Sequence, residues 1–326
     1  MARRRGRPLG GRIGLLFLGE ADVRRLLDVD RLVDALADAF VELSAGRASV
    51  PPRVAALAPG GLLAAMPGYV SGVLETKLVS VFPENDLLGI PTHQALIALF
   101  DQETGVPLAV MDGTRITAVR TGAASALATR TLAREDARVL AVLGAGVQGR
   151  SHLEAVTRTR DFSEIRVASR RRDHADALAR QFGGRSAASF EEAVRGADVV
   201  CCCTDSPEPI LRRDWLSPGA HVTSVGAARA GPELDRDTVT AGLLVVESRV
   251  AFQPYPAGAH ELQGLEPDAA VEVGEVLAGT RPGRTSDDEI TVYKSMGHAV
   301  EDAAAARLVL ERARAEGVGV ELDLAG

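Results

Sequence analysis

An apolar strand runs directly into a glycine-rich turn in the stretch Val139-Leu140-Ala141-Val142-Leu143-Gly144-Ala145-Gly146-Val147-Gln148-Gly149. The G-x-G-x-x-G spacing gives each glycine a separate steric role. Gly144 permits the tight turn, Gly146 lets the backbone approach a pyrophosphate, and Gly149 lets the following helix pack closely on the strand. The first turn of that helix also offers free N–H groups and a partial positive charge to phosphates. We therefore predict a dinucleotide site, made by the consecutive residues Gly144, Ala145, Gly146, Val147, Gln148 and Gly149.

The end of the next strand indicates which dinucleotide is bound. A carboxylate usually stands roughly 20 residues beyond the last glycine when a ribose 2′-hydroxyl is recognised. That place holds Ser169-Arg170-Arg171 and no carboxylate. Because guanidinium groups suit bidentate contact with a phosphate, we predict NADPH as the cofactor, held by Ser169, Arg170 and Arg171, with NADH as the less favoured choice. The alternative interpretation is a run of solvated surface arginines in front of a helix.

Strands and helices alternate along the chain from Arg138 onward. Strands are expected at 139–143, 165–168, 198–203, 221–224 and 243–246, and helices at 147–156 and 173–182. This alternation predicts a doubly wound parallel sheet of the Rossmann type.

The first part of the chain has a different pattern. A helix is expected at 29–43, then β-prone runs at 61–66, 76–82, 94–100 and 108–111, then an alanine-rich helix at 117–133. Strands that follow one another directly favour an antiparallel sheet. A last strong helix, 299–315, is expected to return to this first part. We therefore predict an α/β protein in which a Rossmann-type domain, residues 128–299, is inserted in a second α+β domain with a mostly antiparallel sheet, residues 1–127 plus 300–326.

Composition and charge exclude several classes of protein. Lys and Arg total 37 against 44 Asp and Glu, and the resulting net charge of −7 argues against a nucleic-acid binder. No apolar run approaches the ~18 residues of a membrane helix. The consecutive residues Cys201, Cys202 and Cys203 are interpreted as small buried hydrophobes, not as zinc ligands or disulfides. Residues 1–15 are expected to form a loose basic tail without signal-peptide features, which predicts a cytoplasmic protein.

Cations occur at apolar positions of the first part. Lys77 lies in an apolar strand, Arg120 lies in the alanine-rich helix, and Arg53 follows a proline pair. A charge in such a place must be paired, solvated or functional. If these residues and Thr92 point at one pocket, they form a trap for a carboxylate beside the nicotinamide, with His93 as a candidate proton carrier. The alternative is that each cation is a structural ion-pair partner.

Several longer motifs occur along the chain: Pro91-Thr92-His93-Gln94, 109–113, 116–128, 143–148, Val225-Gly226-Ala227, Glu233-Leu234-Asp235, Lys294-Ser295-Met296-Gly297 and 299–302. Together they resemble the ornithine cyclodeaminase/mu-crystallin family of nicotinamide-dependent enzymes. The resemblance implies a Rossmann domain and a substrate domain that pairs with a second subunit through its sheet, giving a homodimer. It also implies that Arg53, Lys77 and Arg120 hold the substrate carboxylate, and that Thr92 contacts the cofactor near the nicotinamide.

One segment departs from the cyclodeaminase pattern of this family. The aspartate that engages a substrate's distal amine is replaced by Ala228 within Gly226-Ala227-Ala228-Arg229, and an unpaired ammonium in a closed site is costly. Asp205 and Asp235 are the nearby candidates that could replace it. We therefore predict an NAD(P)H-dependent reductase of cyclic or open imino acids. The alternatives are ornithine cyclodeamination, alanine-type amino-acid dehydrogenation, and a nucleotide-loaded binding protein with little turnover.

Overall fold

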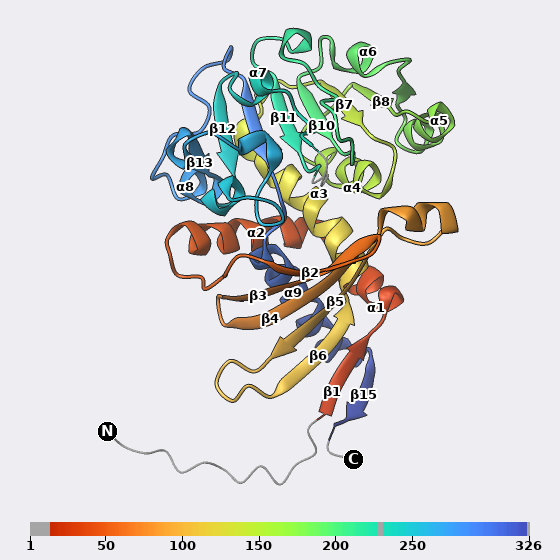
Figure 1. Ribbon diagram of the computed structural model, residues 1–326, viewed down its shortest axis with the longest axis vertical. Helices are drawn as coiled ribbons and strands as arrows, with labels where there is room; N and C mark the ends of the chain where they lie inside the picture. Colours follow the sequence, from red (N-terminus) through yellow and green to blue (C-terminus); the bar gives the residue numbers. More distant parts are fainter. Residues whose placement is uncertain (1–13, 227–230, 325–326) are drawn as a thin grey trace.

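The computed structural model describes residues 14–226 and 231–324, which form two β-sheets with helices packed against them (Figure 1). One sheet has eight strands: β7 (Val139–Leu143), β8 (Glu164–Ala168), β9 (Arg185–Ser186), β10 (Val199–Cys202), β11 (His221–Ser224), β12 (Leu243–Val246), β13 (Ala270–Glu272) and β14 (Thr291–Lys294). Their order is β13-β12-β14-β11-β10-β7-β8-β9, and neighbouring strands pair in parallel. The helices of this half are α4 (Val147–Val156), α5 (Arg172–Gln181), α6 (Phe190–Val194), α7 (Arg236–Val239) and α8 (Val273–Leu277). The predicted parallel sheet is confirmed.

The other sheet has seven strands: β1 (Gly14–Leu18), β2 (Val54–Ala58), β3 (Gly61–Val70), β4 (Val73–Val81), β5 (His93–Phe100), β6 (Pro107–Asp112) and β15 (Val320–Asp323). Their order is β15-β1-β6-β5-β4-β3-β2, and every neighbouring pair is antiparallel except β1 with β6. Alternate residues of β3 are buried, as the period of a half-buried strand requires. The predicted, mostly antiparallel second sheet is therefore also confirmed.

Helices cover the inner face of the antiparallel sheet. Around it lie α1 (Glu20–Leu26), α2 (Val29–Ser44) and α9 (Ala299–Glu316), with the 3₁₀ helix η1 (Pro83–Leu88) between β4 and β5. The last helix, α9, packs directly on β3 and β4, although about 220 residues of chain separate it from them. It therefore carries its first-turn acids, Glu301 and Asp302, to the residues on the inner face of β4.

The long helix α3 (Gly113–Leu132) connects the two halves and packs against elements of both (Figure 1). The Ser151 hydroxyl of α4 donates to the carbonyl of Ala118 at 2.6 Å, and Nε2 of His152 lies 2.8 Å from the Ser125 hydroxyl. One apolar core joins α2, α3 and α9 with residues of both sheets. The predicted boundary between residues 127 and 128 falls inside this helix, and the assignment of whole domains stays a prediction.

Two sequence-based expectations need correction. Residues 1–15 are not all a loose tail, because Gly14 and Leu15 belong to β1, which pairs with β6 and with β15; residues 1–13 lie outside the described residues. The alanine-rich helix begins at Gly113 rather than at 117, because the Asp112 carboxylate caps it by accepting from the Arg115 N–H at 2.8 Å. Within the described ranges, no helix is both long and apolar enough to cross a lipid bilayer.

Candidate functional site

The glycine-rich turn between β7 and α4 has the geometry of a phosphate cradle. Gly144 has a φ of +113°, and a Cβ there would lie 2.5 Å from the carbonyl oxygen of Cys203. A Cβ at Gly149 would overlap the carbonyl oxygen of Gly144. At Gly146, by contrast, no described atom lies within 4 Å of a Cβ position. The turn is thus packed tightly at its two ends and open at its middle, where the N-terminus of α4 begins, and these residues fit the pyrophosphate of a dinucleotide.

The arginines after β8 lie beside this turn. The Gly144 N–H donates to the carbonyl of Ala168 at 2.8 Å, so the end of β8 directly adjoins the glycine-rich turn. The Arg170 side chain is 82% exposed, and its Nη2 is 3.9 Å from a carboxylate oxygen of Asp205. Nε of Arg171 lies 3.1 Å from Nε2 of His174. Neither guanidinium is held in a buried ion pair, so both are free to turn toward a ligand on the cradle.

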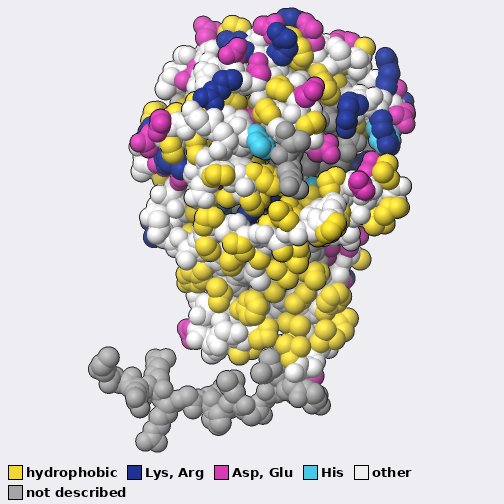
Figure 2. Space-filling model, viewed as in Figure 1, with side chains coloured by type: hydrophobic (Ala, Val, Ile, Leu, Met, Phe, Trp, Pro, Cys, Tyr) yellow, Lys and Arg dark blue, Asp and Glu magenta, His cyan; other side chains and the backbone are white. Residues whose placement is uncertain are grey.

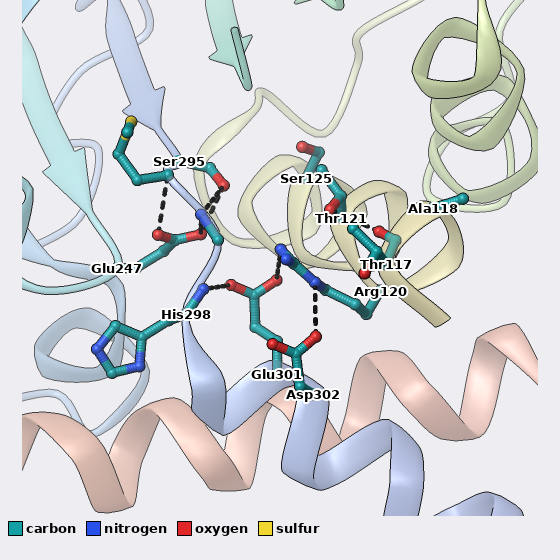
Figure 3. A network of polar contacts seen from close by, with 12 residues as sticks. Thr117, Ala118, Arg120, Thr121, Ser125, Glu247, Ser295, His298, Glu301 and Asp302 are labelled. Atoms are coloured by element: carbon teal, nitrogen blue, oxygen red, sulfur yellow. Dashed lines mark hydrogen bonds and ion pairs between the residues drawn. The ribbon is translucent and has the colours of Figure 1, made fainter. Parts of the chain in front are cut away.

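Lys77 and Arg120 meet two acids of α9 in a buried cluster; Figure 3 shows Arg120 with both acids. Nζ of Lys77 is 2.7 Å from Oδ2 of Asp302. Arg120 contacts both acids, with Nη1 at 3.0 Å from Oε2 of Glu301 and Nε at 3.2 Å from Oδ1 of Asp302. Lys77 is 1% exposed and Arg120 is 4% exposed. Each cation is therefore a partner in a structural ion pair, as the alternative interpretation expected, and the Nη2 donors of Arg120 make no hydrogen bond within the described chain.

Arg53 lies near the same cluster, beside the segment that precedes α9. The Nη2 of Arg53 donates to the carbonyl of Met296 at 2.8 Å and also to the carbonyl of Gly297. The Glu247 carboxylate holds this backbone in place, since it accepts from the Ser295 hydroxyl at 2.5 Å and from the Met296 N–H at 3.0 Å (Figure 3). The segment that follows β14 therefore connects the parallel sheet directly to the three cations.

A pocket lies between the two halves at this place. It is lined from the first half by residues around Arg53 and by Met66, and from the second half by residues around Glu247 and Met296. Gly144, Gly226 and Met296 follow β7, β11 and β14, so they share the carboxyl edge of the parallel sheet. Ligands of doubly wound sheets bind outside this edge. The cation cluster is thus placed opposite the edge at which a dinucleotide is expected.

Electrostatics within the cluster favour a mixture of charged and neutral groups. Burial, together with the nearby Arg120, lowers the pKa of Lys77 to about 8, although the Asp302 charge opposes this shift. Burial disfavours ionisation of Asp302, but the charges of Lys77 and Arg120 outweigh it and lower its pKa. Burial raises the pKa of Glu301 well above its usual range, and the neighbouring Glu247 adds to this effect. Burial therefore favours the neutral form of Glu301, although the contact with Arg120 opposes this shift.

Thr92 and His93 lie at the start of β5, next to the cluster. The Thr92 hydroxyl is 3.1 Å from Nδ1 of His93. The imidazole retains an exposed surface, yet the surrounding chain and then the charge of Lys77 lower its pKa, while Asp205 of the other half acts in the opposite sense. His93 is therefore neutral at neutral pH and faces both halves. The structure brings Thr92 and His93 together with Lys77 and Arg120, and their individual roles stay predictions.

The acids of the cluster were missed as functional candidates in the sequence, where 299–302 served only as a family motif. Glu301 and Asp302 are wholly buried in an alanine-rich helix. The rule that singled out Arg120, a charge within an apolar helix, applies equally to them and could have found them. Within the described ranges, no group of three or more His, Cys, Asp or Glu side chains could hold a metal ion.

A second buried network fixes the ends of loops at the carboxyl edge. The Glu233 carboxylate accepts from the Thr204 N–H at 2.7 Å and from the Gly226 N–H at 2.8 Å. Nζ of Lys294 donates to the carbonyl of Gly226 at 2.5 Å and lies 3.2 Å from Oε1 of Glu261. Three of the motifs found in the sequence therefore meet in one network. Ala228, which carried the prediction about the distal amine, lies outside the described residues, whereas Asp205 and Asp235 are both described.

A model of one protein family matches residues 15–317, nearly the whole described chain; its description is "Ornithine cyclodeaminase/mu-crystallin family". The chain belongs to this family. The resemblance found in the sequence motifs is thereby confirmed.

Members of the ornithine cyclodeaminase/mu-crystallin family with known activities are similar over most of the chain. Ketimine reductase mu-crystallin of Mus musculus is 43% identical over 256 residues, which cover 77% of this chain and 80% of the mouse protein. Alanine dehydrogenase of Archaeoglobus fulgidus is 35% identical over 316 residues, covering 94% of this chain and 98% of that protein. The solved structure of Thermococcus litoralis Delta(1)-pyrroline-2-carboxylate reductase, in complex with NADH and L-proline, superposes with a TM-score of 0.89 at 35% identity, covering 94% of this chain and 100% of that one.

Proposed function

We propose that this chain is an NAD(P)H-dependent reductase that transfers hydride to the C=N bond of an imino acid. The observation that carries this proposal is the group of three cations, the buried Lys77 and Arg120 and the partly buried Arg53, opposite the carboxyl edge of the parallel sheet. Two of the similar proteins described above are a ketimine reductase and a Delta(1)-pyrroline-2-carboxylate reductase. A dinucleotide site alone would also suit a binding protein with little turnover, but a pure binder has no need of such a cluster.

The substrate carboxylate binds this cluster in our proposal. Lys77 has donors left beyond its contact with Asp302, and the Nη2 donors of Arg120 have no partner in the described chain. A carboxylate that accepts charge-assisted hydrogen bonds from both cations is held in one orientation. The imine carbon, which is bonded to the carboxylate carbon, then lies at a fixed distance from the cluster and faces the parallel sheet.

The residues beside Lys77 favour a substrate without a second charge. Pairing of the strands places Met66 and Ile97 beside Lys77 on the inner face, and the next row toward the second half consists of Ala64, Val79 and Ala95. These three residues belong to a small apolar cluster against which Tyr255 of the second half packs. A distal ammonium would find no anion in this row, and burying it unpaired would cost several kcal/mol. A small apolar ring, by contrast, can pack against Ala64, Val79 and Ala95 without such a cost.

Reduction requires a hydride and a proton. The nicotinamide supplies the hydride, and residues of this chain position the imine and deliver the proton. Lys77 is suited to donate this proton to the nitrogen, because its pKa of about 8 makes the ammonium a stronger acid than an ordinary lysine. His93, which adjoins the cluster but is neutral, is the second candidate. Arg53 and Arg120 keep the carboxylate in place during the transfer.

We further propose that NADPH is preferred to NADH. Ser169, Arg170 and Arg171 follow β8 beside the phosphate cradle, and no carboxylate takes the place of the ribose partner. The exposed Arg170 side chain can turn to a 2′-phosphate without breaking a buried contact. The relative from Thermococcus litoralis binds NADH, so this preference is a property of the present chain that must be measured.

A homodimer that forms through the antiparallel sheet also belongs to the proposal. Apolar side chains gather over this half of the molecule (Figure 2). The exposed apolar residues on the sheet include Phe17, Val54, Leu57, Leu63, Leu78 and Leu96. An exposed apolar face of this kind is typical of a protein–protein interface. A cytoplasmic location stays a prediction from the sequence.

Alanine-type dehydrogenation is the second candidate function. The relative from Archaeoglobus fulgidus is an alanine dehydrogenase, and an apolar row of Ala64, Val79 and Ala95 accepts a methyl group as readily as a ring. Ornithine cyclodeamination is less favoured, because the row of Ala64, Val79 and Ala95 beside Lys77 offers the distal amine no anion.

A substrate panel with both reduced cofactors tests the proposal. We expect oxidation of NADPH with small cyclic imines that carry a carboxylate, slower reaction with pyruvate and ammonia, and no ammonia release from ornithine. Fast reductive amination of pyruvate would favour the alanine dehydrogenase. Conversion of ornithine to proline without net consumption of the cofactor would favour the cyclodeaminase, and absence of every reaction would favour the binding protein.

A further inference from the structure

Glu75 is a buried acid within the cation cluster that the proposed reaction does not use. It lies on the inner face of β4, two residues before Lys77, and is 2% exposed. Neither of its carboxyl oxygens has a hydrogen-bond partner in the described chain. The opposite residue is Gly68 of β3, and a Cβ there would lie 3.2 Å from Oε1 of Glu75. The strand beside Glu75 therefore leaves room for its carboxyl group but provides no donor for it.

The charged groups around Glu75 come from three elements. Lys77 lies on the same strand, Asp302 on α9, and Arg120 on α3. On its other side, β5 contributes only the apolar Leu99 as the directly paired residue. Both cations form their short contacts with acids of α9 and not with Glu75. Among the four acids Glu75, Glu247, Glu301 and Asp302, Glu75 is therefore the one with neither a hydrogen-bond donor nor a counter-ion at contact distance in the described chain.

A carboxylate in such a place is unstable. Removing an ionised carboxylate from water without hydrogen bonds is far more costly than removing a neutral acid. Burial and the negative charge of Asp302 raise the pKa of Glu75 well above its usual range, and Lys77 and Arg120 do not compensate. Glu75 therefore keeps its proton at neutral pH.

The proton on Glu75 changes the charge that a substrate meets. Three cations, Arg53, Lys77 and Arg120, share the cluster with four acids, Glu75, Glu247, Glu301 and Asp302. With every acid ionised, the cluster would carry a net negative charge and would repel a carboxylate. With Glu75 and Glu301 neutral, one positive charge remains, which matches the single negative charge of an imino acid's carboxylate.

We propose that Glu75 is a positioning residue for the substrate carboxylate, a neutral carboxylic acid behind Lys77 that keeps the cation cluster net positive. It acts through Lys77 and Arg120 and does not touch the substrate. This inference rests on the proposed function, since it assigns the carboxylate of the imino acid to the same cluster. It adds a residue whose protonation controls that binding step.

The test compares the protein with its Glu75→Gln variant, which keeps the shape of the side chain and cannot ionise. At pH 7 we expect the KM for a cyclic imino acid to stay within about twofold, because one neutral group replaces another. As the pH is raised to 10, Lys77 loses its proton in both proteins, but only the original protein has a group at position 75 that can become an anion. The KM of the original protein should then rise further, by a factor on the order of ten, than that of the variant. Coincident pH profiles, or a KM that falls severalfold at pH 7 in the variant, would overturn the proposal.

An infrared measurement on the protein without substrate gives an independent readout. A protonated carboxyl group has a C=O band distinct from that of a carboxylate, and we expect Glu75→Gln to remove part of this band at pH 7. The control is Glu84→Gln, which replaces an exposed acid of η1 and should leave the band unchanged. If the Gln variant does not fold, titration of the band in the original protein replaces it, and absence of the band at pH 7 contradicts the proposal. Because this readout needs no turnover, failure of the proposed enzymatic function is distinguishable from failure of the role of Glu75.

Discussion

The phosphate cradle and the cation cluster belong to different parts of the molecule, the turn between β7 and α4 and the elements around β4, and they are built in opposite ways. The cradle comes from six consecutive residues, and backbone geometry makes it: two glycines are packed tightly, and one is open. The cluster comes from β4, α3, α9 and the segment before β2, and side-chain charge makes it. A site made by the backbone depends on glycines, whose missing side chains leave room for the turn and for the ligand. A site made of charges depends on every partner being present, so damage to the two sites should have different consequences.

The largest effect is expected from Arg120→Leu. The substitution leaves Glu301 and Asp302 without their shared cation, and breaking a buried ion pair of this kind costs about 3–5 kcal/mol. Denaturant unfolding should show this loss, and the KM of the imino acid should rise at least tenfold in whatever protein folds. Arg115→Leu on the same helix is the control, because Arg115 is 3.7 Å from its partner Glu154 and lies outside the cluster. An unchanged free energy of unfolding would show that Arg120 does not stabilise the buried Glu301 and Asp302.

The two kinds of glycine in the cradle should separate stability from cofactor binding. Gly149→Ala places a methyl group against the carbonyl of Gly144, so we expect a loss of stability of about 1–3 kcal/mol from the strain. Gly146→Ala places the methyl group in open space, so the free energy of unfolding should change little while the Kd of the cofactor rises at least tenfold. Calorimetric titration and thermal unfolding of both variants check this. Equal effects of the two substitutions on cofactor binding would contradict the assigned roles.

Arg170→Ala should affect one cofactor and not the other. A charge-assisted contact with a 2′-phosphate contributes about 1.5–3 kcal/mol, so the affinity for NADPH should fall roughly ten- to a hundredfold. The affinity for NADH should be unchanged, because Arg170 is exposed and paired only loosely with Asp205. Arg166→Ala would be a poor control, since Arg166 forms a 2.8 Å ion pair with Glu164; Arg150, an exposed arginine of α4, is a better one. An equal loss for both cofactors would contradict the preference for NADPH.

The smallest expected effect concerns the row beside Lys77. Val79→Ala enlarges the space above Ala64 and Ala95, so kcat/KM should shift by a few fold toward a six-membered cyclic imine over a five-membered one. Leu78→Ala, one residue earlier on the same strand, changes the opposite, exposed face and should leave the ratio unchanged. Competition between the two imines measures the ratio directly. A larger effect of Leu78→Ala would show that this row does not contact the ring.

The contrast between the cradle and the cluster also explains which parts of the structure could be predicted from the sequence. The cradle, the parallel strands β7, β8 and β10 to β12, and the antiparallel strands β3 to β6 follow from local patterns, since a strand shows its period and a turn its glycines within ten residues. The strands β1, β2, β9, β13 and β14 were not predicted. The cations were identified singly, because Lys77 and Arg120 interrupt apolar segments. Their partners were not identified, because the pairing of Lys77 with Asp302 requires α9 to lie on β4, which no local pattern encodes. Glu75 was missed for the same reason: its lack of a donor is visible only once Gly68 and Leu99 are known to flank it. The strand β15 was missed because it is short and pairs with β1 at the far end of the chain.

The continuity of α3 has a mechanical consequence. This helix carries Arg120 near its middle, and the Ser151 hydroxyl and His152 imidazole clamp it to α4, the helix that opens the cradle. An unbroken helix transmits displacement along its length and bends sharply only at a proline, a bulge or a comparable defect; α3 contains no proline. Arg120, which is proposed to hold the carboxylate, and α4, which opens the phosphate cradle, are therefore both attached to the same continuous helix. Opening the two halves would therefore require the contacts of Ser151 and His152 with α3 to break.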